Sequence, residues 1–182
     1  AQLLKDNAFL LLDGLESITE KQAEMLGTLN GFSLDSVKEL SDRQVELLSQ
    51  SRSVYLNGLR ALTDKQAESL GNCEHVSLDA LESITAIQCE ALQNLELLEL
   101  NGLKSMSNEC AVALGKVKWL HLNGLKVISL EQIEALGEVS SLQLHGLKTL
   151  NDAQFVAFGK SEIGQLILSG LSQLTDAQTE HL

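Results

Sequence analysis

A repeat of 22 residues constrains the fold of this chain more than any other feature of its sequence. The pattern apolar–x–Leu–Asx returns along the chain, with small variations, in steps of 22 residues six times and then 24 once. Its anchor leucines are Leu12, Leu34, Leu56, Leu78, Leu100, Leu122, Leu144 and Leu168. A fixed step over a whole chain is the signature of a solenoid, in which each unit packs on its neighbours. We therefore expect residues 1–182 to form a single array of about eight repeats.

Each unit predicts a short strand, a turn and a short helix. In residues 54–57 the side chains alternate with a period of two, as in a strand with one buried face. Gly58 follows and indicates a turn that uses positive φ. Thr63 and Gln66 have the spacing of a capping box, so a helix should begin after Thr63. Gly71 is typical of the C′ position that ends a helix.

The helix signals recur in every unit. The expected N-cap residues are Thr19, Ser41, Thr63, Thr85, Ser107, Ser129, Asn151 and Thr175. Three residues further stand Gln22, Gln44, Gln66, Gln88, Gln132, Gln154 and Gln178, with Cys110 as the exception. Helices are expected to end at Gly27, Gly71, Gly115, Gly137 and Gly159. The two extra residues near 161–164 should bulge from the loop between a helix and the next strand.

The spacing of strands and helices predicts a curved body. Strands stack about 4.8 Å apart, whereas helix axes need about 8–10 Å. The fold class is therefore an α/β solenoid with a concave parallel sheet and short convex α-helices. The handedness rule for parallel strands joined through a helix predicts a right-handed coil.

The ends of the chain match the interior of a repeat. Ala1 and Leu4 precede Ala23 and Leu26 by 22 residues, and Leu182 matches Leu26 again. We expect the chain to be a piece of a longer array without capping repeats at its ends. Uncapped ends would expose apolar surface, so end-to-end self-association is one expected interaction.

Composition excludes several classes of partner. The formal net charge is -12, which disfavours nucleic acid and anionic membranes because these need clusters of Lys and Arg. No apolar run has the length needed for membrane insertion, and no signal peptide is visible. The three cysteines are an odd number that no disulfide framework uses in full. Unpaired cysteines favour a reducing, cytoplasmic location.

The residues that do not recur fall on the outward strand positions, which we call the concave face. One row of this face contains Leu11, Ser33, Tyr55, Ser77, Glu99, His121, Gln143 and Ile167, and the row two residues earlier contains Phe9, Gly31, Ser53, His75, Leu97, Trp119, Ser141 and Gln165. Aromatic side chains are common anchors in interfaces. The candidate partner-binding residues are Tyr55, His75, Leu97, Glu99, Trp119, His121, Gln143 and His145.

Other polar columns have structural explanations. His121 and His145 lie near Glu99, but the offset between their strands strains a metal site, so no metal or cofactor is expected. The Asx column after the strands indicates turn chemistry rather than a ladder of ligands. Two charged columns are expected to be solvated surface. The broken basic column contains Lys38, Arg60, Lys104, Lys126 and Lys148, and the acidic column contains Glu24, Glu46, Glu68, Glu90 and Glu134.

No enzyme motif is present in the sequence. It contains no Gly-rich phosphate loop, no CxxC and no G-x-S-x-G. Cys73 and His75 could pair as nucleophile and base. However, Cys73 takes the place of Leu29, Leu95 and Val117 in other repeats, and Cys89 takes the place of Ala23. Both cysteines are therefore expected in the core, and the chain is not expected to be an enzyme.

The unit L-x-L-x-G-L-x-x-L-T-D-x-Q-A-E-x-L-G resembles the leucine-rich repeat family. It is similar to the cysteine-containing subclass with its I-T-D motif, although Leu or Val replaces that cysteine and the units are shorter. It is more similar to bacterial arrays built from L-T-D-A-Q-A-E-A-L units. The resemblance covers the whole chain. It implies a protein-interaction module that binds on its concave sheet.

Three functions fit these patterns. The first is a non-enzymatic module that binds a protein or peptide on the concave face. The alternatives are a structural spacer whose length and stiffness are its function, and a glycan-binding surface that uses Trp119 as a stacking platform. Binding that weakens in Trp119→Ala and His121→Ala, with folding intact, would favour the first function.

Overall fold

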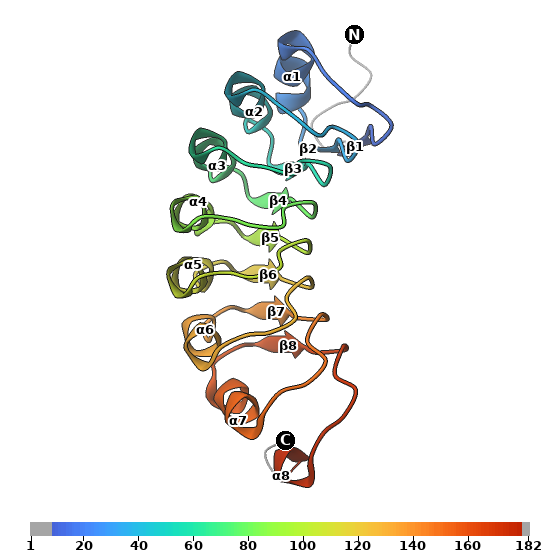
Figure 1. Ribbon diagram of the computed structural model, residues 1–182. Helices are drawn as coiled ribbons and strands as arrows, with labels where there is room; N and C mark the ends of the chain where they lie inside the picture. Colours follow the sequence, from blue (N-terminus) through green and yellow to red (C-terminus); the bar gives the residue numbers. More distant parts are fainter. Residues whose placement is uncertain (1–8, 180–182) are drawn as a thin grey trace.

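The computed structural model describes residues 9–179, which form one parallel sheet flanked by short helices (Figure 1). Within this range the sheet has eight strands in sequence order, and each strand pairs only with those of adjacent repeats. The strands are β1 (Phe9–Leu11), β2 (Gly31–Ser33), β3 (Ser53–Tyr55), β4 (His75–Ser77), β5 (Leu97–Glu99), β6 (Trp119–His121), β7 (Ser141–Gln143) and β8 (Gln165–Ile167). The register keeps the 22-residue step as far as β7, so Val54 pairs with Val76 and Leu98 with Leu120.

A helix follows every strand. The helices are α1 (Glu20–Gly27), α2 (Asp42–Leu48), α3 (Asp64–Leu70), α4 (Ala86–Leu92), α5 (Asn108–Leu114), α6 (Leu130–Ala135), α7 (Asp152–Lys160) and α8 (Asp176–Thr179). Within the described residues, none of these helices has the length and apolar character needed to cross a membrane. The helices predicted at both ends of the chain extend into residues 1–8 and 180–182, which lie outside the described part.

The body curves as the spacing argument predicts. In Figure 1 the strands follow the inner arc and the helices the outer arc, with neighbouring helices further apart than neighbouring strands. This arrangement confirms the expected α/β solenoid with a concave parallel sheet. The right-handed coil stays a prediction.

The core runs between sheet and helices along the whole array and is mostly aliphatic. Leu56, Leu78 and Leu100 are completely buried, as are the central residues of the middle strands, Val54 and Leu98. Burial decreases toward both ends of the described chain: Leu15 is 39% exposed and Leu174 is 47% exposed, although both occupy repeat core positions. The interior repeats are therefore stabilised by a neighbour on both sides, as is usual in solenoids.

The predicted N-caps are confirmed, and their glutamines have a second role. In α3 the Thr63 hydroxyl accepts from Gln66 N, and Gln66 Oε1 accepts from Thr63 N. The remaining amide hydrogens of Gln66 donate to Leu40 O of the preceding repeat at 2.8 Å. The same link recurs at Gln44, Gln88, Gln132, Gln154 and Gln178. We call this column of inter-repeat bonds the glutamine ladder.

The recurring glycines have a different cause from the one predicted. Gly71 caps α3 with φ of -62°, so its backbone is right-handed and not the left-handed C′ conformation. A Cβ atom there would lie 2.1 Å from Ala91 O of the next helix. At the turn glycine Gly102 it would lie 2.2 Å from Asp79 O, again without positive φ. The expectation of positive φ is therefore wrong: these glycines allow backbones of consecutive repeats to approach closely.

The two extra residues of the seventh unit lengthen a helix instead of a loop. α7 has nine residues and continues through Gly159 to Lys160, whereas α3, α4 and α5 each have seven. The predicted bulge near 161–164 and the predicted helix end at Gly159 are both wrong. Two added residues lengthen a helix by only about 3 Å, or about half a turn, and β8 still pairs in register with β7.

Two of the three cysteines are paired. Cys89 in α4 and Cys110 in α5 form a disulfide with their Cα atoms 5.3 Å apart, and both are fully buried. The expectation of unpaired cysteines is wrong, because the N3 position of one helix packs against the N4 position of the preceding helix. Cys73 is a buried free thiol. The predicted core location holds for Cys73 and Cys89.

Candidate functional site

The strand register arranges the predicted binding residues in two rows on the concave face. Along one row, Tyr55, Ser77, Glu99, His121 and Gln143 pair in order from β3 to β7. Along the second row lie His75, Leu97 and Trp119. The central residue of each of these strands points into the core, so the rows face outward. His145 follows β7 and is exposed at the edge of the face.

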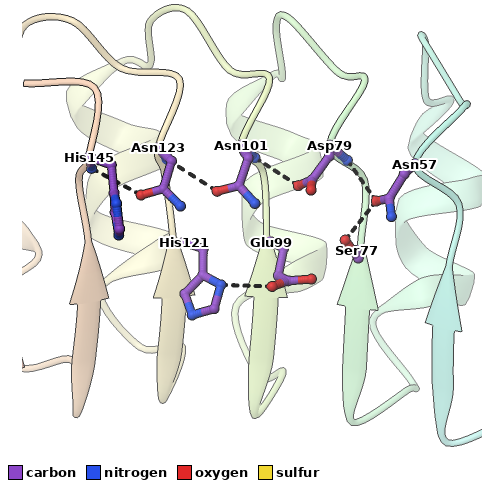
Figure 2. Close-up of polar contacts among 8 residues, drawn as sticks. All are labelled: Asn57, Ser77, Asp79, Glu99, Asn101, His121, Asn123 and His145. Atoms are coloured by element: carbon purple, nitrogen blue, oxygen red, sulfur yellow. Dashed lines mark hydrogen bonds and ion pairs between the residues drawn. The ribbon is translucent and has the colours of Figure 1, made fainter. Parts of the chain in front are cut away.

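The Asx column forms a ladder that joins neighbouring repeats. Figure 2 shows it from Asn57 to His145. The side-chain oxygen of Asn57 accepts from Asp79 N at 3.1 Å, and that of Asp79 accepts from Asn101 N at 3.0 Å. The ladder ends with His145 N donating to Asn123 Oδ1. These side chains support the fold, as expected, but by bonding the next repeat and not their own turn.

Glu99 and His121 form a partly buried polar pair on the concave face. His121 Nδ1 lies 2.8 Å from Glu99 Oε1, and the two side chains are only 18% and 22% exposed, respectively. The hydrogen bond with His121 lowers the pKa of the Glu99 carboxyl, against the opposing effect of burial. Burial and the charge of Glu99 raise the pKa of Tyr55.

Apolar side chains occupy two separate places on the concave face. Trp119 is 37% exposed and pairs with Leu97 across β5 and β6, while the Lys118 ammonium lies 4.5 Å from its ring centroid. Nearer the N-terminus, the rings of Phe9 and Tyr55 meet edge to face at 5.2 Å. Gly31 lies between their strands, and a Cβ there would clash with the ring of Phe9.

A charged cluster lies where β4 and β5 begin, and only His75 among its members was predicted as a site residue. Arg52 forms an ion pair with Glu74, and Lys118 Nζ lies 3.8 Å from Glu96 Oε1. His75 Nε2 lies 3.8 Å from Glu96 Oε2. The signal was the 22-residue step itself, which places Arg52, Glu74, Glu96 and Lys118 at equivalent positions just before four consecutive strands.

The structure separates the residue pairs considered for other chemistry. Cys73 donates to Ser49 O while His75 bonds Ser53, and burial raises the pKa of the Cys73 thiol to about 12. A buried thiol of this kind is a poor nucleophile. His145 Nδ1 lies 2.7 Å from Ser169 Oγ, on the side away from Glu99 and His121. The basic and acidic columns are exposed, as expected.

Comparisons with known proteins identify the fold. No protein-family model and no curated protein matches the sequence. An internalin structure, InlF from Listeria monocytogenes strain 4b F2365, is similar with a TM-score of 0.60 and 13% identity over 87% of this chain and 46% of that chain. The functional domain of InlJ from Listeria monocytogenes, which includes a cysteine ladder, gives a TM-score of 0.42 and 10% identity over 96% of this chain and 56% of that chain.

The class of protein follows from these observations. The in-register parallel sheet, the convex helices and the 22-residue step define a leucine-rich-repeat solenoid, and the likeness to InlF confirms this fold. Within the class, the chain is similar to bacterial leucine-rich-repeat proteins, as its repeat unit predicts. It spans about half the length of the two internalin chains.

Proposed function

We propose that this chain is a non-enzymatic interaction module that binds a protein or peptide segment on the concave face. The residues that recur in the sequence are used by the fold, as core leucines, as the Asx ladder and as the glutamine ladder. The residues that vary lie on the concave face and include the exposed Trp119. The proposal rests on this observation: the recurring side chains make the contacts that hold the fold together, and varying side chains remain on the concave face.

The concave face has the dimensions and chemistry of a peptide-binding surface. Eight strands at about 4.8 Å span about 34 Å, the length of roughly ten extended residues. Leu97 and Trp119 offer apolar contact area, and Glu99 with His121 offers a polar pair beside them. Interfaces typically combine an aromatic anchor with such partly buried polar groups.

The experiment that tests this function is peptide selection followed by affinity measurement. A displayed library of peptides about ten residues long would be selected against the 182-residue chain. Fluorescence anisotropy would then give the dissociation constant of an enriched, labelled peptide for wild type and for Trp119→Ala. Loss of an aromatic anchor should weaken binding at least about tenfold.

A matched control separates the concave face from general surface stickiness. Val112 is 58% exposed on α5, on the convex side, so Val112→Ala should leave the affinity unchanged. Circular dichroism should show that both variants stay folded. A selection that enriches no peptide, or binding that Trp119→Ala and Leu97→Ala both leave intact, would favour the structural spacer instead.

A further inference from the structure

Three side chains with metal-ligating atoms converge where β4 and β5 begin. Glu74 and His75 come from one repeat and Glu96 from the next, 22 residues after Glu74. One ligating atom from each lies within 4.8 Å of the others. The closest approach given by the structure is 3.8 Å, from His75 Nε2 to Glu96 Oε2. Two ligands bound to the same ion lie about 3–4 Å apart at typical zinc bond lengths, so small side-chain adjustments would bring the set together.

The backbones that carry these side chains are bonded to one another. Glu96 N and Leu97 N both donate to Glu74 O, at 2.9 and 3.1 Å. Glu74 N and His75 N both donate to Arg52 O, at 2.9 and 3.1 Å. The three ligand positions are therefore fixed by the sheet, and little conformational entropy is lost on gathering their backbones around an ion.

Each candidate ligand also has its own outer partner. Ser53 Oγ lies 3.1 Å from His75 Nδ1, which leaves Nε2 on the side of Glu96. Arg52 holds Oε2 of Glu74, and Lys118 approaches Oε1 of Glu96. Each cation thus contacts one oxygen of a different carboxylate, and the second oxygen stays available. Ligands in metal sites are usually oriented by outer-shell bonds of this kind.

We propose that Glu74, His75 and Glu96 form a binding site for a divalent transition-metal ion, with Zn²⁺ as the best fit. One imidazole nitrogen and two carboxylate oxygens are a ligand set that zinc accepts, whereas Ca²⁺ and Mg²⁺ prefer six or more oxygen ligands. Arg52 and Lys118 offset the charge of the two carboxylates, so affinity depends on direct ligation and not on a general negative field. Three protein ligands leave a coordination position for water or for a group from a bound partner.

No metal was expected from the sequence, where His121 and His145 near Glu99 were the candidate ligands. His121 bonds Glu99 directly, and His145 bonds Ser169, so those histidines do not converge on shared ligands. The Glu74–His75–Glu96 cluster differs because its three side chains converge, and each also has an outer partner of its own in Arg52, Ser53 or Lys118. This contrast provides an internal control for the experiment.

Isothermal titration calorimetry with Zn²⁺ alone tests the site. The full 182-residue chain, treated with a chelator and dialysed, should bind one zinc ion, and Mg²⁺ at the same concentration should give no binding. His75→Gln and Glu96→Gln should each weaken zinc binding at least about tenfold, since each removes one of three ligands. His121→Gln is the matched control, because His121 also lies on the concave face and also bonds a carboxylate, that of Glu99. This change should leave zinc binding unchanged.

Trp119 provides a second readout in the same variants. It is the only tryptophan of the chain, and Lys118 lies both 4.5 Å from its ring centroid and 3.8 Å from Glu96. Ni²⁺ bound at the cluster should quench its fluorescence in wild type and in His121→Gln, and not in His75→Gln. The proposal is overturned by an absence of zinc binding, or by zinc binding and quenching that His75→Gln and Glu96→Gln leave intact.

Discussion

At the scale of single residues, hydrogen bonds between neighbouring strands hold side chains of the concave face in place. Glu99 and His121 are directly opposite in the pairing of β5 and β6, and both are mostly buried. The pair is more shielded from water than the exposed Arg43–Glu46 pair on α2, so solvent and salt screen its interaction less. This pair therefore fixes two candidate binding residues in position before any partner arrives.

The Glu99–His121 bond should make stability depend on pH. The pKa of Glu99 is lower in the folded chain than in the unfolded one, where it is about 4.3. Its ionised form therefore stabilises the fold above that value, and this stabilisation is lost as the pH falls through the folded pKa. We expect Glu99→Gln to lower the free energy of unfolding at pH 7 by about 1–2 kcal/mol, and the difference from wild type to shrink in acid.

Urea unfolding followed by circular dichroism at several pH values between neutral and acid measures this difference. Gln143→Ala is the control. Gln143 lies in the same row, beyond His121, and its replacement removes no ionisable group. Its effect should be independent of pH. If Glu99→Gln lowers the free energy of unfolding by the same amount at neutral and at acid pH, the carboxylate does not contribute to stability through its ionisation.

The sequence predicted the rows of the concave face but not the pairs within them. The 22-residue step determines which residues share a row, because the strands stay in register. Which atoms meet depends on side-chain rotamers, as at His75, whose ring bonds Ser53 and approaches Glu96. Glu74 and Glu96 were missed because they precede the strands and were not counted as part of the face.

At the scale of single elements, local signals predicted the strands and the beginnings of helices, and signals between repeats were missed. The N-cap at Thr63 can be predicted from the sequence of one repeat, because both of its hydrogen bonds join Thr63 to Gln66, three residues later. The reason for Gly71 is not visible there, because the atom it avoids is Ala91 O of the next repeat. The same holds for Gln66, whose capping role was predicted and whose bond to Leu40 O was not.

The disulfide occupies the gap in the glutamine ladder between Gln88 and Gln132. Cys110 stands at the N3 position of α5, so it can neither complete the capping box of Ser107 nor reach back to the preceding repeat. By the 26-residue offset of the ladder, a glutamine there would donate to Ile84 O. The Cys89–Cys110 bond joins the same two repeats covalently. We therefore expect the bond between α4 and α5 to replace the missing ladder contact.

Restoring the glutamine should stabilise the chain when the disulfide is absent. Cys89→Ala/Cys110→Gln recreates the residues found at the neighbouring junction of Ala111 and Gln132. Under reducing conditions it should exceed Cys89→Ala in free energy of unfolding by about 1–2 kcal/mol, for two hydrogen bonds gained. Without a reductant, Cys89→Ala should have a free energy of unfolding about 2–4 kcal/mol lower than that of wild type, because it lacks the disulfide. Urea unfolding of the three proteins measures both differences, and equal stability of the two variants would refute the ladder argument.

At the scale of the whole molecule, the chain is a one-dimensional array in which repeats contact their neighbours. The central repeats have fully buried cores, as at Leu78 and Leu100, whereas Leu166 and Leu168 near the end are only partly buried. Stability in such an array is close to a sum of repeat and interface terms. The candidate binding residues and the proposed metal cluster lie on or directly beside β3 to β7, where each repeat has a neighbour on both sides.

Breaking the Asx ladder in the middle should therefore uncouple one part of the array from the other. Asn101 N donates to Asp79 Oδ1, and Asn101 Oδ1 accepts from Asn123 N at 3.3 Å. Asn101→Ala leaves Asn123 N without this acceptor and should cost about 1 kcal/mol. Because the C-terminal repeats have the less buried core, the amides of β6 to β8 should exchange about fivefold faster, and those of β1 to β3 should change less.

Hydrogen exchange followed by mass spectrometry resolves this difference by segment. Asn72→Ala is the matched control, because the Asn72 side chain bonds Glu68 O and Ser69 O within its own repeat. It should not accelerate exchange in β6 to β8. If Asn101→Ala instead accelerates exchange equally in all strands, the array opens as a single cooperative unit, and the ladder supports every repeat without setting a boundary between them. A boundary at β5 and β6 would lie inside the concave face, so opening there would separate Leu97 and Glu99 from Trp119 and His121.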